Sequence, residues 1–550
     1  MTDYVCKYSP VEILYGFGDE ARLLNPMPGG FDAADRVTHR NICGFSRAIA
    51  ETRLGNGNGP LLLSRCCDSI ISVGDVLKSE GQEVFILNLP HDHAQCGKLA
   101  YKKVLMDFIG RCREYYGREF DSDAFRRAFK KTDDNMTGPY IALMGARLGD
   151  ELLGYIKSRS PLPVRNNSCT GTRRLGLPPK TKDVDALMEW YADALLSQTP
   201  CMRMEDISAR RALTSDPNLK GIIYNTVSFC DYYGFEYTDL NKKLRIPMLK
   251  IETDYTPQAE GQMKTRLEAF FENFGERAPK RRKIISTPVL SGKEQYTAGI
   301  DSGSTSTNAV ILDSGRNIVG FYVVPTGVKI SDSAKKALDI ALEKAGLKFS
   351  DIKRTVTTGY GRSGIDFRER DVTEITCHAT GAHFLNPAVR TVIDIGGQDS
   401  KVIHLDETGA VLDFVMNDKC AAGTGRFLEM MAQSLSLSLQ EMSKYGLSWK
   451  EEITISSMCS VFAQSEVVSL IAADKNLEDI VHGLNRSVAM KVLALGGKGK
   501  MKKEYMMTGG VAKNIGVVRE IEAQLGTRIL VPREPEICGA LGAALIAAED

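Results

Sequence analysis

Three turns rich in small residues follow short apolar runs in the second half of this chain, and they constrain its fold most strongly. The first begins at Asp301 in TAGIDSGSTST, the second follows Asp394 in VIDIGGQDS, and the third is TGGVAKN, from Thr508 to Asn514. Each apolar run predicts a buried strand. The first two turns lead into another strand and the third leads into a helix. One such turn is common, but three in this order are strong evidence of a shared design.

The chemistry of these turns suits a nucleotide. Small residues let backbone N–H groups approach phosphate oxygens, and the Asp301 carboxylate can hold Mg²⁺ through water. We expect ATP or ADP with Mg²⁺ to bind between Asp301 and Asp394, which are the expected catalytic residues, and the third turn to lie against the adenosine. The expected nucleotide-binding residues are Gly303, Ser304, Thr305, Ser306, Gly396, Gly397, Gln398, Asp399, Gly423, Gly425, Gly509, Gly510 and Lys513.

Two cysteines in the second half stand close to predicted helix starts. Cys420 lies in DKCAAGTGRFL, and Cys459 lies in ISSMCSVFAQSEVVSL after the β-like run 453–455. Free N–H groups and the helix dipole favour negative charge at a helix start, so both thiols could hold an anionic cluster. A cubane needs about four ligands. A symmetric dimer could supply the other two, with one cluster on the two-fold axis.

The first half alternates strands and helices, which predicts parallel sheets, and we interpret it as two similar α/β lobes. The segment Pro10 to Leu24 is apolar on one face and is expected to be helical. Ligands collect beyond the carboxyl ends of parallel strands, where many of the cysteines fall. The expected ligands form two sets of three, one set in each lobe: Cys43, Cys67, Cys96, Cys169, Cys201 and Cys230.

Some cysteines of the first half remain ambiguous or are set aside. Cys66 competes with Cys67 as a ligand, Cys112 is expected to be structural, and Cys6 is omitted because it lies near a terminus. No CxxC pair occurs, which disfavours local chelation of the zinc-ribbon or ferredoxin type. The run from His91 to Cys96 is either a small metal site or, as we favour, a polar loop.

Composition excludes several classes. The chain has 550 residues, a formal charge of +1 and 13 cysteines. Its length predicts about three to five domains, and the absence of a basic excess gives no support for nucleic-acid binding. We see no signal peptide and no apolar run that could span a membrane, so we expect a cytoplasmic protein. In that compartment cysteines indicate metal ligation or redox chemistry, with buried free thiols as the alternative.

Three segments follow from these patterns. Residues 1–274 form the cysteine-bearing half, 275–295 a linker, and 296–550 the half with the three turns. The linker carries the basic run 280–283, which we interpret as a solvated charge cluster.

The ordered turns resemble those of the acetate and sugar kinase/actin superfamily. Within it, KCAAGTGRFLE and SSMCSVFAQSEV look like the activator (archerase) of 2-hydroxyacyl-CoA dehydratases. The resemblance implies an actin-like ATPase of two ribonuclease-H-like lobes in 296–550. It also implies ATP-driven electron transfer by a homodimer that shares one [4Fe-4S] cluster, with Cys420 and Cys459 at the ligand positions.

The first half is similar to the cluster-bearing dehydratase component, a family that includes benzoyl-CoA reductase subunits and double-cubane cluster proteins. The similar segments are NICGFSRA, SRCCDSIISVGDVL, VSFCDYYGFEY and IPMLKIETDYTPQAEGQMKTRLEAFFE. The implied fold is two Rossmann-like α/β lobes with cysteine-bearing loops. One cubane would need about three thiols and a double cubane, [8Fe-9S], six. Six candidates favour the double cubane.

The predicted function is ATP-dependent, low-potential electron transfer from the [4Fe-4S] cluster to the iron–sulfur cluster of the first half, which reduces a small molecule. A low-potential donor such as ferredoxin or flavodoxin would supply the electrons. The alternatives are a 2-hydroxyacyl-CoA dehydratase or acyl-CoA reductase with a built-in activator, and a sugar or carboxylate kinase in which Asp394 or Asp399 would be catalytic. A further alternative is an ATP-controlled binding or sensor protein with structural zinc.

Overall fold

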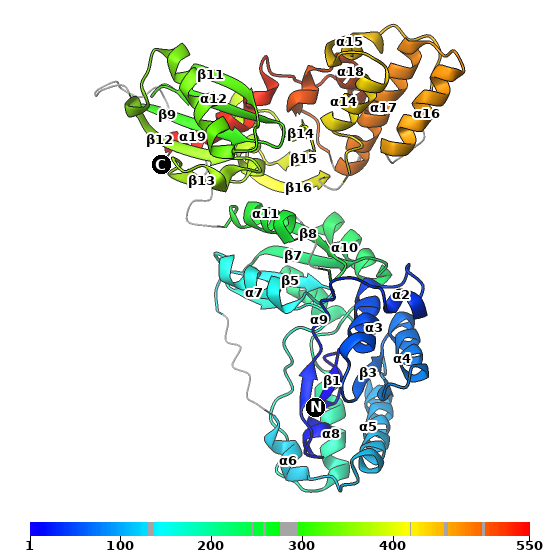
Figure 1. Cartoon of the computed structure of the whole chain (residues 1–550). Coiled ribbons are helices and arrows are strands. Elements are labelled where there is room, and N and C mark those ends of the chain that lie inside the picture. Colours follow the sequence, from blue (N-terminus) through cyan, green and yellow to red (C-terminus); the bar gives the residue numbers. More distant parts are fainter. Residues whose placement is uncertain are drawn as a thin grey trace. The chain divides into compact units, whose positions relative to one another are not determined.

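The computed structural model describes residues 1–129, 137–244, 246–256, 260–274, 295–417, 420–455, 460–497 and 501–549. The chain forms two compact units, Met1–Leu267 and Glu268–Asp550, which we describe separately (Figure 1). In the described part of the chain, no helix is both long and apolar enough to cross a membrane. The protein is of the α/β class, as the sequence predicted.

The first sheet of unit 1 has four parallel strands in the order β2-β1-β3-β4. Its central strand β3 is buried except at its last residue, as is usual for a parallel sheet covered on both faces. The strands are β1 (Thr2–Tyr4), β2 (Ala21–Leu23), β3 (Leu61–Arg65) and β4 (Val84–Asn88). The helices are α1 (Val11–Tyr15), α2 (Ala34–Val37), α3 (Gly44–Asn56), α4 (Asp68–Ser79), α5 (Gln95–Tyr116) and α6 (Ser122–Arg127).

The second sheet of unit 1 is also parallel, in the order β6-β5-β7-β8. Two lobes with parallel sheets were predicted, and the structure contains them. The strands are β5 (Tyr140–Gly145), β6 (Val164–Asn166), β7 (Leu219–Val227) and β8 (Met248–Thr253). The helices that occur along this part of the chain are α7 (Asp150–Arg159), α8 (Val184–Leu196), α9 (Ser208–Ala212), α10 (Asp231–Lys243) and α11 (Glu260–Phe271). Of these, α8 packs with α5 in the core of the first lobe, and α11 crosses the boundary between the units at Leu267.

The helix expected over Pro10 to Leu24 is wrong beyond its first turns. The helix α1 ends at Tyr15, and the chain then enters the edge strand β2. Gly18 has φ +74°, a left-handed conformation that terminates a helix at little cost only in glycine. A Cβ on Gly16 would stand 2.4 Å from the ring of Phe120, so the turn is also packed too closely for another residue.

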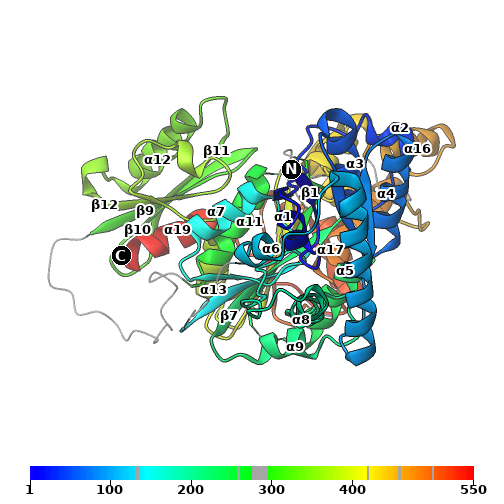
Figure 2. The ribbon, with the colours of Figure 1, turned by 90° about the horizontal axis from the view of Figure 1, so that it is seen from below.

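The first lobe of unit 2 has a mixed sheet in the order β11-β10-β9-β12-β13. Alternate residues of β10 face opposite sides: Ala309 and Ile311 pack with α12, whereas Val310 and Leu312 pack with α19. The two helices therefore cover opposite faces of the sheet (Figure 2). The elements are β9 (Tyr296–Ser302), β10 (Ser306–Leu312), β11 (Ile318–Pro325), α12 (Ile330–Ala345), β12 (Ile352–Thr358), β13 (Arg370–Asp371), α13 (Glu374–Leu385) and α19 (Cys538–Glu549).

The second lobe of unit 2 repeats this design. Its sheet runs β16-β15-β14-β17, again with an antiparallel meander followed by a parallel strand. The strands are β14 (Thr391–Ile395), β15 (Ser400–Leu405), β16 (Val411–Asn417) and β17 (Tyr505–Thr508). The helices are α14 (Gly425–Ser434), α15 (Leu439–Tyr445), α16 (Ser460–Ala472), α17 (Leu477–Gly496) and α18 (Ile515–Leu525).

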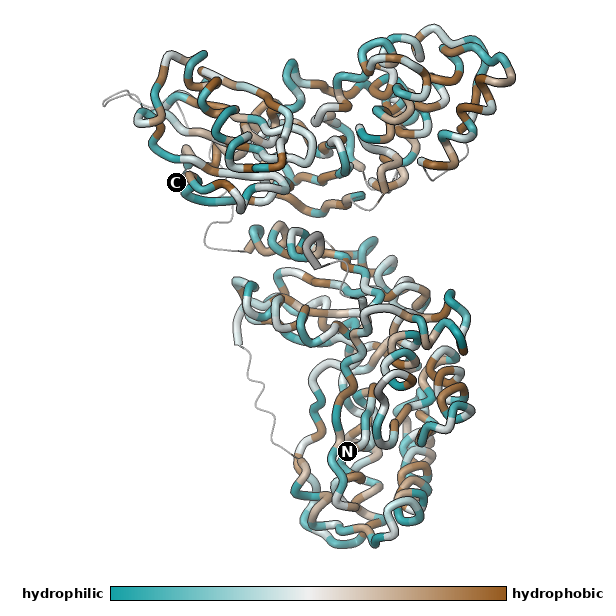
Figure 3. Tube along the Cα trace, in the orientation of Figure 1, coloured by the Kyte–Doolittle hydropathy of each residue, from teal (hydrophilic) through white to brown (hydrophobic). Residues whose placement is uncertain are grey.

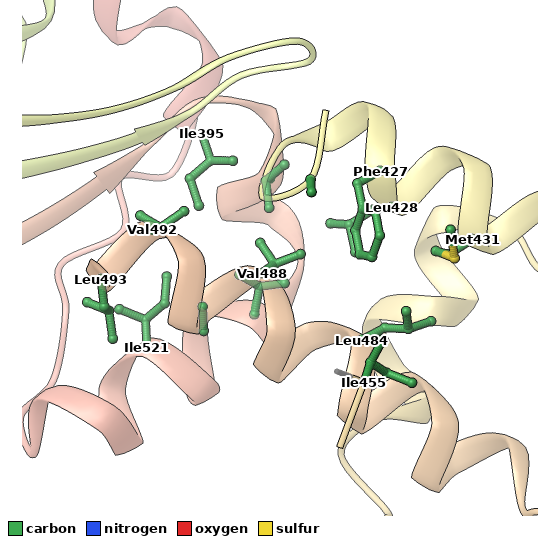
Figure 4. Packing of buried hydrophobic residues seen from close by; sticks show 14 of the residues in the cluster. Ile395, Phe427, Leu428, Met431, Ile455, Leu484, Val488, Val492, Leu493 and Ile521 are labelled. Carbon is green, nitrogen blue, oxygen red and sulfur yellow. The ribbon is translucent and has the colours of Figure 1, made fainter. Parts of the chain in front are cut away.

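Helix α14 packs in the core of the second lobe. Its side chains Phe427, Leu428 and Met431 are buried with Leu484 and Val488 of α17 (Figure 4). This packing fixes the helix that follows Cys420. The run 453–455, expected to be β-like, is not part of any sheet. It lies against α17 instead, where Ile453 O would be 2.6 Å from a Cβ on Gly483.

Candidate functional site

Two buried carboxylates from the two sheets of unit 2 face one histidine. Asp301 lies on β9 and Asp394 on β14, both close to the carboxyl ends of their strands. His378 on α13 places Nε2 3.8 Å from Asp301 Oδ2 and Nδ1 3.4 Å from Asp394 Oδ1. The structure thus brings the two predicted catalytic residues to one place. A Cβ on Gly539 would lie 2.3 Å from Asp301 Oδ2, so the start of α19 closes this site on another side.

The pKa values of the two carboxyls shift in opposite directions. Burial raises the pKa of Asp301 to about 6. Burial acts in the same direction on Asp394, but His378, Lys401 and the hydroxyl of Thr508 together bring its pKa below the ordinary value. Thr508 Oγ1 donates to Asp394 Oδ1 over 2.8 Å. Asp394 is therefore the carboxylate that stays ionised most firmly.

Lys401 on β15 neutralises the acidic side chains beside Asp394. Its buried ammonium lies 3.3 Å from Asp394 Oδ2, 3.3 Å from Glu374 Oε2 and 2.9 Å from Asp399 Oδ1. Burial disfavours this charge, yet the three carboxylates raise the pKa of Lys401 well above its usual range. Such a network fixes the β14–β15 hairpin from which Asp399 comes.

The two predicted phosphate loops are hairpin turns that touch. Gly303 N donates to Ser306 O over 2.9 Å in the β9–β10 turn, and Gly396 N donates to Asp399 O over 3.0 Å in the β14–β15 turn. A Cβ on Gly397 would lie 1.9 Å from Thr305 Oγ1. Only glycine fits at position 397, where the two lobes are in contact. The remaining loop residues, Ser304 and Gln398, are exposed.

The third predicted turn follows β17 and stands next to Asp394. Gly509 has φ +83°, and a Cβ there would lie 2.9 Å from Asp394 Oδ1. Gly510 begins a short 3-10 helix, Gly510–Lys513. Lys513 at its end forms an ion pair with Glu536. The turn therefore joins the same site as the two hairpins.

Cys420 lies in a turn that is tied to the second phosphate loop. Asn417 Nδ2 donates to Cys420 O over 2.9 Å, and the thiol-bearing residue itself is exposed. Helix α14 begins at Gly425, whose amide donates to Gly396 O over 2.9 Å, and Arg426 N donates to Gly397 O over 2.7 Å. These N–H groups at the helix start therefore bond to the second predicted phosphate loop. They are not free to stabilise a cluster, contrary to what the sequence suggested.

The second thiol predicted for the shared cluster, Cys459, lies outside the described residues. The helix after it, α16, is apolar, as its hydropathy shows (Figure 3), yet only Ala463 and Val467 are buried. Its apolar face exposes Val461, Phe462, Val468 and Ile471. Gln464 Nε2 on α16 donates to Ser434 Oγ on α14 over 3.0 Å, so the two helices that follow the cysteines are in contact.

The thiols of unit 1 gather at the carboxyl ends of its strands. Cys43, Cys67 and Cys230 each occupy the position before the first helical residue, of α3, α4 and α10. Cys169 follows β6 and its amide donates to Gly145 O over 2.9 Å. Cys201 is buried after α8.

Interactions among these thiols place most of them in one group. A hydrogen bond with Cys230 lowers the pKa of Cys43 to about 7, and one with Cys66 lowers the pKa of Cys67 to about 6. Electrostatic effects also couple Cys67 to Cys43, and Cys169 to Cys201. Cys6, which was set aside because it lies near a terminus, interacts with Cys169 and Cys201 as well.

Cys96 does not join this group. It is exposed at the start of α5, and its thiol donates to Asp92 Oδ2 over 2.9 Å. His93 pairs instead with Asp206, Nε2 to Oδ2, at 3.6 Å. Within the described ranges, no three His, Cys, Asp or Glu side chains converge to hold a single metal ion. Ligands of a cluster bind different irons and stand farther apart than the about 3.7 Å between thiolates on one zinc.

A cation faces this cluster of cysteine thiols. Arg203 Nη1 lies 4.0 Å from Cys169 Sγ, and Nη2 lies 3.9 Å from Cys230 Sγ. Its Nε is buried without a hydrogen-bond partner. Thiols at helix starts around a guanidinium fit an anionic iron–sulfur group. Sequence reasoning missed Arg203, His378 and Lys401. The one signal for His378 was a histidine in the helical segment ITCHATGAHFL, which also contains His383.

Comparison with protein families assigns each half of the chain. The BadF/BadG/BcrA/BcrD ATPase family matches residues 298–547. The 2-hydroxyglutaryl-CoA dehydratase D-component matches residues 6–138 and 137–274.

Curated relatives match the second half. The activator of lactoyl-CoA dehydratase from Anaerotignum propionicum is 49% identical over 254 residues, 46% of this chain and 98% of that protein. The 2-hydroxyisocaproyl-CoA dehydratase activator of Clostridioides difficile is 43% identical over 255 residues, 46% of this chain and 96% of the relative. The (R)-2-hydroxyglutaryl-CoA dehydratase activating ATPase of Acidaminococcus fermentans is 44% identical over 253 residues, 46% of this chain and 96% of that ATPase.

Two solved structures are also similar. Component A of the (R)-2-hydroxyglutaryl-CoA dehydratase of Acidaminococcus fermentans has 42% identity and TM-score 0.45, covering 46% of this chain and 98% of its own. The 2-hydroxyisocaproyl-CoA dehydratase activator from Clostridium difficile with bound ADPNP has 43% identity and TM-score 0.45, covering 46% and 95%. The family matches and the curated relatives confirm the resemblance noted in the sequence. The chain belongs to the BadF/BadG/BcrA/BcrD ATPase family, with a dehydratase D-component domain fused ahead of the activator ATPase.

Proposed function

We propose that this chain couples ATP hydrolysis in unit 2 to one-electron transfer toward the thiol group of unit 1, where a small molecule is reduced. The repeated strand order of unit 2 supports its assignment as two ribonuclease-H-like lobes of an actin-like ATPase. The relatives named as dehydratase activators support the coupling. The single observation that carries the proposal is the backbone link from Gly396 and Gly397 to the start of α14.

The residues of the nucleotide site have separate tasks in this proposal. Asp394, kept ionised by Lys401 and Thr508, holds Mg²⁺ with Asp301, through water or directly. The hairpin turns at Gly303 and Gly396 present backbone N–H groups to the phosphates. Each lobe contributes one of the two carboxylates that would hold Mg²⁺ and the nucleotide. Nucleotide hydrolysis would therefore change the contacts that hold the two lobes together. A nucleotide shifts an equilibrium only as far as it binds one arrangement better.

Movement of the β14–β15 turn would be transmitted to α14. The carbonyls of Gly396 and Gly397 accept hydrogen bonds from the first two amides of this helix. The turn therefore cannot move independently of the helix without breaking those bonds. The turn that holds Cys420 leads directly into α14. The last residue of α14, Ser434, contacts Gln464 of α16, and α16 exposes an apolar face. We propose that this face packs against a second copy of the chain.

The thiols would hold the iron–sulfur groups. Cys420 and Cys459 from two copies would bind one [4Fe-4S] cluster. The iron–sulfur group of unit 1 would be bound by Cys43, Cys67, Cys169, Cys201 and Cys230. Cys66 and Cys6 are further candidate ligands of that group. We leave Cys96 out because it lies apart. When bound, these groups supply low-potential, one-electron chemistry. A ferredoxin or flavodoxin would serve as the donor.

A second candidate function rests on the match of residues 6–274. The matching family is named as a 2-hydroxyglutaryl-CoA dehydratase component, so unit 1 could act on a 2-hydroxyacyl-CoA, or reduce an acyl-CoA, with its activator built in. We do not propose the sugar or carboxylate kinase that the sequence left open, because the curated relatives described above are named as dehydratase activators.

Iron and acid-labile sulfide analysis of the anaerobically purified full chain tests the proposal. Wild type should be a coloured dimer with iron in both units. Cys420→Ser should lose only the iron of the shared cluster, and Cys112→Ser, a buried thiol in α5 remote from the group, should lose none. An iron-free wild type, or full iron in Cys420→Ser, would contradict the assignment.

A further inference from the structure

The three buried arginines among the described residues of unit 1 each pair with an acid. An arginine is almost never buried without a paired acid, because desolvation of the charge must be compensated. These pairs are Arg53 with Asp3, Arg147 with Asp150, and Arg210 with Glu236, and the half-buried Arg173 pairs with Glu12 in the same way.

Arg203 is half-buried and, unlike these arginines, faces thiols. No carboxylate among the described residues lies within ion-pair distance of it, and its Nε is buried without a partner. Its Nη atoms approach Cys169 Sγ and Cys230 Sγ, and Nη1 is also 3.5 Å from the hydroxyl of Tyr233. The guanidinium carbon lies 4.8 Å from the ring centroid of Tyr232 and 5.4 Å from that of Tyr233. The cation is thus held by aromatic faces and directed at thiols.

We infer that Arg203 is a positioning residue that raises the reduction potential of the iron–sulfur group held by the surrounding cysteines. The inference rests on the function proposed above, because it requires that group in unit 1. Arg203 would not be a ligand. It would donate N–H···S hydrogen bonds to the thiolates of Cys169 and Cys230. It would also supply a positive charge that no carboxylate of the described residues neutralises.

The physical reason lies in the charge balance of reduction. One electron, delivered from unit 2 in the proposed function, adds one negative charge within a ring of thiolates, with no bond formed or broken. A fixed cation at this distance stabilises the more negative state more than the oxidised state. Hydrogen bonds to sulfur and net charge are established determinants of cluster potential. Lys7, a buried cation that interacts electrostatically with Cys201 and Cys169, acts in the same direction but donates to Thr199 O.

The test is a redox titration of the anaerobic full chain, followed by the paramagnetic resonance of each cluster. Arg203→Met removes the charge, and Arg203→Lys keeps it while losing the two-pronged donor. Arg211→Met removes an exposed charge from the same segment and serves as the control. The shared cluster held by Cys420 is an internal control, because its potential should not move in any variant.

We expect the ratio of reduced to oxidised unit 1 cluster, at fixed potential, to fall about tenfold in Arg203→Met, which is about 59 mV for one electron. Arg203→Lys should fall between this variant and wild type, and Arg211→Met should match wild type. Unchanged potentials in both Arg203 variants at full iron content would overturn the inference. So would loss of this iron in both variants with an intact fold, since Arg203 would then serve cluster assembly. A wild type without iron in unit 1 would instead refute the proposed function.

Discussion

The amide of Gly425 donates to the carbonyl of Gly396 over 2.9 Å, which joins the first residue of α14 to the turn between β14 and β15. The turn belongs to the candidate nucleotide site, and the helix follows the turn that holds Cys420. The amides at a helix start are usually satisfied by side-chain caps or water. Here they bond to a loop of the candidate nucleotide site, which is a direct mechanical connection between that loop and an expected cluster ligand.

Substitution of Gly397 by alanine should disrupt the contact between the two hairpin turns. The added Cβ would meet Thr305 Oγ1 at 1.9 Å, so one loop must move. We expect ATP hydrolysis to fall at least about tenfold, because loop geometry within an ångström matters for positioning. Steady-state phosphate release and nucleotide affinity measure this effect.

The matched control for this variant is Gly364→Ala, where the nearest atom to a new Cβ is 3.8 Å away. Combining Gly397→Ala with Thr305→Gly should restore much of the activity, because the obstructing side chain is removed. Equal loss in the double variant would show that the contact is not the cause.

His378→Asn should slow hydrolysis more than it weakens nucleotide binding. The imidazole is within 4 Å of both Asp301 and Asp394 and lowers the pKa of the latter. Without it the two carboxylates lose a shared positive or hydrogen-bonding partner, so more Mg²⁺ should be needed for half-maximal rate. The Mg²⁺ dependence of kcat and the nucleotide Kd separate the two effects. His383→Asn on the same helix is the control, and equal effects of both substitutions would contradict this role.

Most of the scaffold could be predicted from the sequence, because apolar runs and glycine turns report strands and their ends locally. Asp301 and Asp394 were placed at strand ends, and the structure brings them together. The contact of Gly396 with Gly425 could not be predicted, because it joins two backbone groups that leave no side-chain signature.

The thiol group of unit 1 was predicted only in part, for a physical reason. Position after a strand does not fix the direction of a side chain. Cys96 follows β4 as Cys67 follows β3, but Cys96 falls inside the first turn of α5 and bonds to Asp92. Arg203 has no local pattern at all, since an unpaired cation is recognised only when its surroundings are known.

Phe229 adopts φ +62° directly before Cys230, a conformation that is strained for a bulky residue. Its side chain is 59% exposed, so little burial would be lost on replacement. Phe229→Gly should therefore stabilise this loop by about 1 kcal/mol. Hydrogen exchange of β7 and α10 in the full chain should slow.

The control for this substitution is Phe235→Gly, which replaces another exposed phenylalanine but within helix α10. There glycine is unfavourable by about 1 kcal/mol relative to alanine, so exchange should accelerate. The same sign of change in both variants would disprove the strain at Phe229.

The buried pair of Arg210 and Glu236 should be costly to break from one side. Arg210 Nη2 donates to Glu236 Oε2 over 2.8 Å, Nε contacts the other oxygen, and Nη1 donates to Asn167 O. Glu236→Gln leaves a buried guanidinium without its counter-charge, which should destabilise unit 1 by about 3–5 kcal/mol. Arg210→Met with Glu236→Leu should cost less than either single change in urea denaturation. A larger loss in the double variant would contradict this expectation.

Electron transfer between the two units on addition of MgATP is the most direct test of the central claim. The anaerobic full chain is reduced chemically until only the cluster at Cys420 carries an electron, and MgATP is then added while the paramagnetic signals are followed. We predict that the signal of the unit 1 group appears as the first signal declines, and that neither changes with a non-hydrolysable analogue or in Asp301→Ala. Transfer at the same rate without ATP would contradict the coupling, as would no transfer with it.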